Sequence, residues 1–260
     1  MELVIIGLAA GLASALTLFS GFGLGTVLMP VFALFFPVPL AIAATAVVHF
    51  ANNLFKLGLL ARQADWRVVV RFGIPAALAA FVGALLLDRF DQMTPLLTYE
   101  WGGAAHEVTI LKAIIGGLMV LFALLELWPR FQALAFPARY LPLGGALSGF
   151  FGGLSGHQGP LRAAFLIKLG LPKEAFIATS AVAASIVDVS RLLVYGTGFL
   201  AEHFNRSREL LLPVTVGTLC AFAGALIGAR LMHKVTLRAV QGVVAGMMLL
   251  IGSGLIVGLL

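Results

Sequence analysis

Long apolar runs separated by short polar connections dominate the chain. Runs such as 110–128, 210–227 and 239–260 approach or exceed the ~20 residues that a helix needs to cross a ~30 Å hydrocarbon core. They lack the apolar–polar alternation of a barrel strand, so the pattern indicates helices. It predicts continuous helices at roughly 39–61, 68–88, 108–128, 173–198, 209–230 and 235–259.

Two further apolar segments are broken by glycine and polar residues. The first runs from Gly11 through Ser20–Gly25 to Pro37, and the second from Gly145 through Ser155–Arg162 to just before Pro172. Interrupted helices at matching positions of two halves are typical of transporter binding sites, because their freed backbone groups must face something polar. Function is therefore sought at these breaks.

Internal similarity extends beyond the breaks. Matching segments follow the same order in both halves: 41–46 with 175–180, 80–85 with 221–226, and 108–112 with 235–238. The chain is interpreted as one integral membrane domain made of two repeats, 1–128 and 139–260, each a broken or re-entrant segment plus three transmembrane helices.

The basic residues between the helices favour inverted repeats. If each broken segment returns to its starting side, ten of them face the cytoplasm together, as the positive-inside rule requires: Arg62, Arg67, Arg71, Arg130, Arg139, Lys168, Lys173, Arg230, Lys234 and Arg238. Both termini then lie outside. Full-length hairpins and shallow re-entrant loops both satisfy this pattern. The loop 92–106 is expected to be an ordinary external connection with interfacial aromatics, and a substrate gate is the alternative.

Composition supports a membrane protein and narrows the partners. Hydrophobic residues make up 61% of the chain and charged ones 11%, which excludes an ordinary soluble globule. The net charge of +6 is scattered singly between apolar runs, so no nucleic-acid surface is expected. Cys220 is the only cysteine, which excludes an intrachain disulfide. We expect no cofactor, no metal and no catalytic residue, and the oligomeric state is left open.

Four charged residues fall within the predicted hydrocarbon region, namely Lys56, Arg162, Asp188 and Arg191. Such charges cost at least ~2.5 kcal/mol each on insertion scales, so each is a functional hypothesis. Three bases against one acid favour an anionic ligand. Their neutral companions are His49, Asn52, Asn53, His157 and Gln158.

Arg162 is the strongest single candidate, because it follows the second break by one to two turns. A helix beginning there points its positive end and unpaired N–H groups at the break. Glycines allow close approach of a ligand, and Ser155, His157 and Gln158 can donate to oxygen atoms. The alternatives are a snorkelling Arg162 near the cytoplasmic boundary, and a His157 that is merely hydrogen-bonded or lies on a proton pathway.

Asn53 and Lys56 share a three-residue spacing with Asp188 and Arg191, which places each pair on one helix face. Lys56 and Arg191 are candidates to attract an anion at the inner and outer mouths. The alternatives are an internal Asp188–Arg191 ion pair and a snorkelling Arg191. The complete set of candidate substrate-binding residues is Ser20, Gly21, Gly23, Asn53, Lys56, Ser155, Gly156, His157, Gln158, Gly159, Arg162, Asp188 and Arg191.

These residues resemble the sulfite exporter TauE/SafE family of membrane permeases. The resemblance rests on Ser20–Gly25 followed by Pro30, on Ser155–Gly159 and on Lys173–Ser180, and the duplicated layout covers nearly the whole chain. It implies movement of sulfur-containing or related organic anions across the inner membrane, commonly export of sulfite or sulfoacetate.

The leading hypothesis is a secondary anion transporter working by alternating access, with the lipid bilayer and a small anion as partners. A coupling proton or ion is considered, through His49, His157 or Asp188. A passive anion channel is the first alternative. An intramembrane enzyme is the second, although no HExxH, GxSxG or paired-carboxylate arrangement is present.

Overall fold

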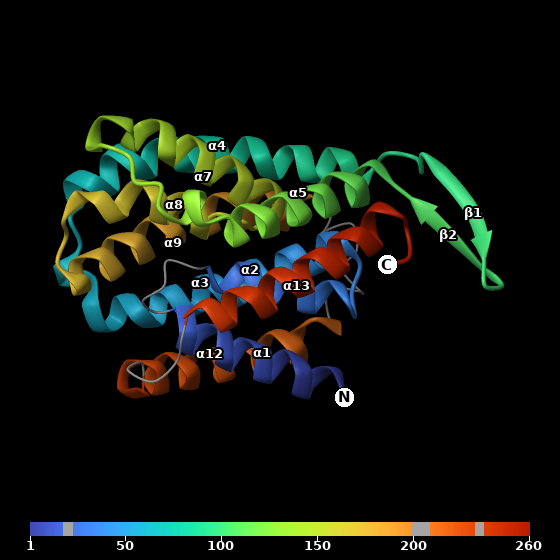
Figure 1. Cartoon of the computed structure of the whole chain (residues 1–260), viewed down its shortest axis with the longest axis horizontal. Helices are drawn as coiled ribbons and strands as arrows, with labels where there is room; N and C mark the ends of the chain where they lie inside the picture. The colour runs from blue at the N-terminus through green and yellow to red at the C-terminus, as the bar shows by residue number, and fades with distance from the viewer. Residues whose placement is uncertain (18–22, 199–208, 232–236) are drawn as a thin grey trace.

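The protein is an almost wholly helical bundle in the computed structural model, which describes residues 1–17, 23–198, 209–231 and 237–260 (Figure 1). Its elements are α1 (Glu2–Thr17), α2 (Leu24–Ala33), α3 (Val38–Leu60), η1 (Ala61–Gln63), α4 (Trp66–Asp91), β1 (Leu97–Trp101), β2 (Ala104–Val108), α5 (Ile110–Leu127), α6 (Pro129–Gln132), η2 (Ala138–Tyr140), α7 (Leu141–Ser155), α8 (Gly159–Leu166), η3 (Ile167–Leu169), α9 (Lys173–Thr197), α12 (Leu211–Leu231) and α13 (Leu237–Ile256). Among the described residues, five helices are long and apolar enough to cross a membrane.

The six continuous helices predicted from the apolar runs are all present, with ends shifted by up to three residues. Capping explains two of the shifts. The Asp65 side chain accepts hydrogen bonds from the N–H groups of Arg67 and Val68, so α4 begins two residues before its predicted start. Thr109 accepts from the N–H of Lys112 in the same way and fixes the start of α5.

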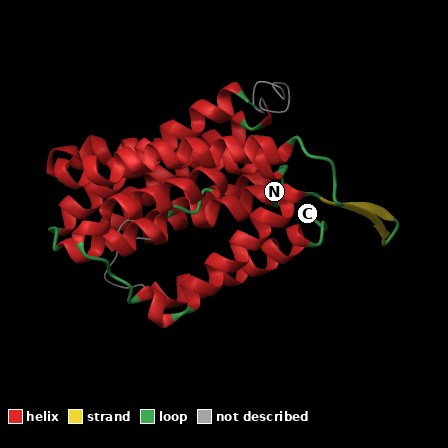
Figure 2. Ribbon diagram, turned by 90° about the horizontal axis from the view of Figure 1, so that it is seen from above, coloured by secondary structure: helices red, strands yellow, loops and turns green. Residues whose placement is uncertain are grey.

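The connection after α4 contains a β-hairpin, which the sequence analysis did not predict. Strands β1 and β2 pair antiparallel from Leu97 with Val108 to Trp101 with Ala104. Gly102 and Gly103 form the turn with positive φ angles of 61° and 80°, which glycine adopts without a steric penalty. The hairpin projects from the bundle at the end where both chain termini lie (Figures 1 and 2).

The second broken segment is interrupted as predicted. Helices α7 and α8 are separated by three residues, 156–158. Gly156 ends α7 with a φ of +82°, and Pro160 occupies the first turn of α8, where a missing N–H is tolerated. In the first half, α1 and α2 flank the segment 18–22, which lies outside the described residues.

In each broken segment, the longer helix, α1 or α7, packs through glycine contacts against a helix of the other half. Gly145, Gly149 and Gly153 on α7 lie against the carbonyl groups of α4 residues Phe72, Ala76 and Ala80. These contacts rise together in sequence, so α7 and α4 run parallel. A matching set, in which Gly224 meets Gly11 and Gly228 meets Ala15, makes α12 parallel to α1.

The relation between the two halves can be judged from the directions of corresponding helices. Helix α3 runs antiparallel to α9, since Asp65 lies near Thr179 and His49 near Asp188. Helix α5 runs antiparallel to α13, because Gly116 meets Gly252 while Gly258 meets Glu107. Each of these helices therefore runs opposite to its sequence counterpart. The inverted-repeat interpretation stays a prediction that these directions support.

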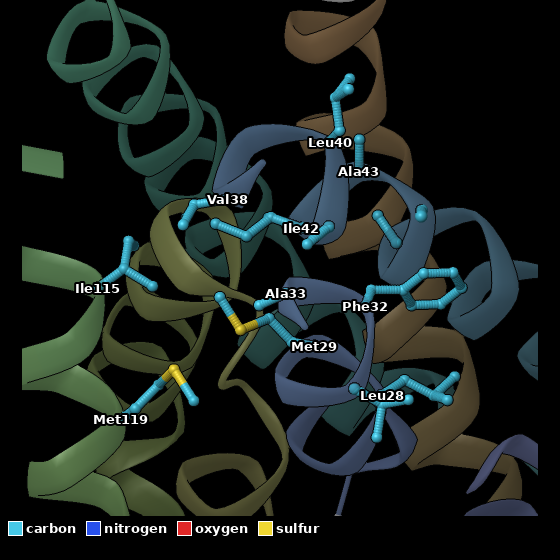
Figure 3. Close-up of a cluster of buried hydrophobic side chains, with 14 of the residues drawn as sticks. Leu28, Met29, Phe32, Ala33, Val38, Leu40, Ile42, Ala43, Ile115 and Met119 are labelled. Carbon is cyan, nitrogen blue, oxygen red and sulfur yellow. The ribbon is translucent and has the colours of Figure 1, made fainter. Parts of the chain in front are cut away.

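A buried apolar cluster packs α2 between α3 and α5 (Figure 3). Leu28, Met29 and Phe32 of α2 are fully buried, and Met29 lies on the side of Ile115 and Met119 from α5. Between helices in a membrane, such contacts stabilise the fold through van der Waals packing rather than through removal of apolar surface from water. The cluster holds α2, including its start beside Gly23, inside the bundle.

Candidate functional site

The two breaks meet inside the bundle. A Cβ added to Gly23 would lie 3.4 Å from Cα of Gly159, and one added to Gly25 would lie 3.1 Å from the carbonyl oxygen of Gly156. These glycines flank the starts of α2 and α8, so the two helices begin beside each other. Their positive N-terminal ends converge on one place, which favours negative charge there.

At the second break, carbonyl groups at the end of α7 accept hydrogen bonds from side chains, whereas backbone N–H groups at the start of α8 lack acceptors among the described residues. The Gly152 carbonyl at the end of α7 accepts a 3.2 Å hydrogen bond from Nη1 of Arg191, and the Gly153 carbonyl accepts from the Tyr195 hydroxyl. By contrast, the N–H groups of Gly159 and Leu161 have no acceptor among the described residues. Unsatisfied donors at a helix N-terminus form a ready site for an anion.

Asp188 is the centre of a buried polar network. Its Oδ1 accepts hydrogen bonds from Nη2 and Nε of Arg191 at 2.7 and 3.1 Å, and from Nε2 of Gln158 at 3.0 Å. Its Oδ2 lies 2.6 Å from Nδ1 of His49 and accepts a longer bond, at 3.5 Å, from Asn53. Helices α3 and α9 and the second break are thereby joined through one carboxylate, which is fully buried.

Arg162 extends this network toward α8. It is only 6% exposed and donates from Nη1 to Oε1 of Gln158 at 2.9 Å and from Nε to the Ser180 hydroxyl at 2.8 Å. Burial of this kind does not fit the snorkelling alternative. A guanidinium has five N–H donors, so these two bonds leave three for another acceptor. No carboxylate lies within ion-pair distance of Arg162 in the part of the chain described.

The structure corrects two expectations about Arg191. It is fully buried, so it neither snorkels nor stands at an outer mouth. Its charge is balanced by Asp188, which is the internal ion pair held as the alternative. The charge near the breaks that lacks a carboxylate partner among the described residues therefore comes from Arg162 and from the partly buried Lys56, which repel each other.

The sequence analysis did not count Glu126 among the charged residues inside the bundle. It is 2% exposed in the last turn of α5, where the apolar run had been interpreted as continuous. The expected ratio of three bases to one acid is therefore wrong for the whole bundle. Among the described residues, no ion pair links a carboxylate to Arg162 itself.

His157 lies in the break itself. Its ring stacks on Phe122 of α5 with centroids 5.4 Å apart and planes at 4°, and its Nδ1 is 3.2 Å from the Ser155 hydroxyl. The other nitrogen, Nε2, is buried and has no hydrogen-bond partner in the described part of the chain. Desolvating an unpaired polar atom costs roughly 1–3 kcal/mol, so this nitrogen is a candidate contact for a ligand.

Three more buried polar atoms without partners lie on α2 and α3: the hydroxyls of Thr26 and Thr45 and Nδ2 of Asn52. Thr26 and Thr45 lie next to Gly23 and Gly25. Asn52 accepts a bond from Ser14 of α1, 3.1 Å away. Helical spacing brings Thr45, His49 and Asn52 onto one face of α3.

The structure thus brings together most of the predicted site: Gly23, Asn53, Ser155, Gly156, His157, Gln158, Gly159, Arg162, Asp188 and Arg191. Lys56 lies at its edge, and Ser20 and Gly21 lie outside the described residues. The sequence analysis named His49 and Asn52 only as neutral companions of the charged residues, and it did not include Thr26. The signal for His49 and Asn52 was the polar i, i+3, i+4 pattern on one apolar helix. Thr26 on α2 is not part of that pattern.

These features define a class of protein: a multi-pass, helical membrane protein of the permease type, with two broken helices meeting at a buried cation. The chain belongs to the family described as Sulfite exporter TauE/SafE, whose sequence profile matches residues 3–255. Membership makes it a membrane permease for sulfite-type anions, in a family of transporters rather than enzymes. A search among curated proteins found no match.

Proposed function

We propose that this protein is a secondary transporter of small sulfur-containing oxyanions, such as sulfite or organosulfonates including sulfoacetate. The anion binds where α2 and α8 begin and crosses by alternating access. The protein works as an exporter in the cell inner membrane. Residues 1–128 and 139–260 act as two inverted repeats of one membrane domain.

The observation that carries this proposal is the junction of the two breaks with Arg162 beside it. Two helix N-termini, free N–H groups at Gly159 and Leu161, and an arginine without a carboxylate partner among the described residues all present positive charge to one point. An oxyanion offers several acceptor oxygens to such donors, and arginine binds it through two parallel bonds. A cation would be repelled.

The unpartnered atoms around the junction favour a small, oxygen-rich ligand. Nε2 of His157 and the hydroxyls of Thr26 and Thr45 can each donate one hydrogen bond, and none of these three atoms has a partner among the described residues. A sulfite or sulfonate group has three oxygens to receive them. The proposed contacts also use Ser155, Gly156 and Gln158 from the second break and Gly23 from the first.

Opposed helix directions support alternating access. In transporters with inverted repeats, one group of helices rocks against the other around a fixed central site. Here α3 and α9 run antiparallel across the centre, and both termini lie at the end with the acidic hairpin, which is the end predicted to be outside. The Asp188–Arg191 pair lies along that central contact.

The experiment is counterflow in proteoliposomes that contain the purified protein. Vesicles loaded with unlabelled sulfite or methanesulfonate should accumulate the labelled anion transiently and saturably, and chemically unchanged. Conductance with no counterflow would favour the channel, and recovery of a chemically altered compound would favour the enzyme. Chloride-loaded vesicles serve as the control, because accumulation in them would deny selectivity for sulfur oxyanions.

A further inference from the structure

We propose that His49 carries a proton that crosses the membrane together with the anion, and that Asp188 and Gln158 link its charge to Arg162. This inference rests on the proposed function, since it assigns a coupling ion to the same site. The contacts form an unbroken chain across α3, α9 and the second break.

The proton is located by one distance. Nδ1 of His49 and Oδ2 of Asp188 are 2.6 Å apart, and two such atoms approach so closely only with a proton between them. The other carboxylate oxygen accepts three bonds from Arg191 and Gln158, so it carries no proton. Asp188 is ionised in its pair with Arg191, so the proton belongs to Nδ1 of His49, and Nε2 is the atom that gains or loses one. Nδ2 of Asn53 lies 3.1 Å from the same Nδ1 and then donates to Asp188 instead.

The charges around His49 come from three helices. Asp188 and Arg191 face it from α9 and Arg162 acts on it from α8, while Lys56 lies about two turns along its own helix. Helices α1 and α2 carry no charged residue near it, and α12 meets α3 through Gly217 and Phe222. Asp188 and Arg191 cancel each other, so a proton on His49 adds one positive charge to a site already positive.

The net positive charge of the site determines whether proton binding strengthens or weakens anion binding. An anion beside Arg162 lowers the free energy of protonated His49, and a proton on His49 strengthens anion binding by the same factor. Proton and anion therefore bind together and cross in one direction. Outward flow follows when the outward gradient of the anion exceeds the inward gradient of the proton.

Gln158 gives this coupling a physical connection. Its amide donates to Asp188 and accepts from Arg162, so a change in how strongly Asp188 is held by His49 reaches the guanidinium through a single side chain. Gln158 is 1% exposed, and its backbone carbonyl accepts a 2.9 Å bond from Ser148 of α7. The amide is thus fixed between the two charged groups.

The test uses methanesulfonate, whose charge is constant over the range in which histidine titrates, about pH 5 to pH 8. Proteoliposomes hold a trapped pH dye, and the membrane potential is clamped. Methanesulfonate added outside the wild-type vesicles should acidify the lumen, and its binding affinity should be about tenfold higher at the lower pH. The variant His49→Gln should lose both the acidification and the pH dependence of affinity, and its counterflow, measured in the same vesicles, should not vary with pH.

The outcomes separate the two proposals. Wild-type counterflow without acidification, or with alkalinisation of the lumen, would overturn the coupling and leave the anion transporter intact. Acidification by His49→Gln equal to wild type would also overturn it. No counterflow of any sulfur oxyanion by a folded wild-type protein would remove the proposed function itself. His106→Gln, a change on the hairpin, is the matched control and should behave as wild type.

Discussion

Gln158 donates a 3.0 Å hydrogen bond to the carboxylate of Asp188 across thirty residues of sequence. The same amide accepts from Arg162, so the residue ties the ion pair of α9 to the arginine of α8. The proposed anion-binding arginine and the Asp188–Arg191 ion pair are therefore directly connected. The predictions below test its parts separately.

Arg162→Ala should weaken binding of sulfite or methanesulfonate at least about tenfold, because hydrogen bonds to charged groups contribute roughly 1.5–3 kcal/mol. Arg162→Lys should give an intermediate affinity, since lysine keeps the charge and loses the paired geometry. Titration calorimetry on the purified protein measures both. The exposed Arg139→Ala is the control, and wild-type affinity in Arg162→Ala would contradict the proposed site.

His157→Phe should preserve the fold while weakening anion binding. Phenylalanine retains a ring to stack on Phe122 and removes Nε2, which has no hydrogen-bond partner among the described residues, together with the Nδ1 contact to Ser155. We expect thermal stability at or above that of wild type, with affinity reduced by roughly the tenfold or more that a lost bond to a charged group implies. A less stable variant with unchanged affinity would assign His157 a purely structural role.

Asp188→Asn should destabilise the protein by about 3–5 kcal/mol, because it leaves the buried guanidinium of Arg191 without its carboxylate. Removing both charges, as in Asp188→Leu with Arg191→Met, should cost less than the single change. Thermal unfolding in detergent micelles compares them. Glu100→Gln, on the exposed hairpin, is the control. A double variant less stable than Asp188→Asn would show that other contacts dominate.

Gly149→Ala should disrupt the contact between α7 and α4, because the added methyl group would overlap the carbonyl of Ala76. Overpacking of this kind costs roughly 1–3 kcal/mol. Gly117→Ala is a matched control on α5, where an added Cβ meets nothing within 4 Å. Equal melting temperatures for the two variants would contradict the described packing.

The sequence predicted the helices well because their lengths are set by the bilayer and their apolar runs are unambiguous. It missed the β-hairpin: Leu97, Tyr99 and Trp101 alternate with polar residues in the first strand, but the second strand, Ala104–Val108, carries no such alternation. It predicted the Asp188–Arg191 pair as an alternative, because the two lie three residues apart on one helix. The contact of His49 with Asp188 spans 139 residues, and no local pattern encodes it.

The glycine contacts between the halves have a consequence for how the chain divides mechanically. Helix α7 of the second half packs closely against α4 of the first half, and α1 of the first half packs closely against α12 of the second. If the protein works by alternating access as proposed, the units that move are therefore expected to combine helices of both halves. A chain cut within the 128–139 connection would give two fragments that each lack the surface on which their own broken helix rests, and neither would assemble without the other.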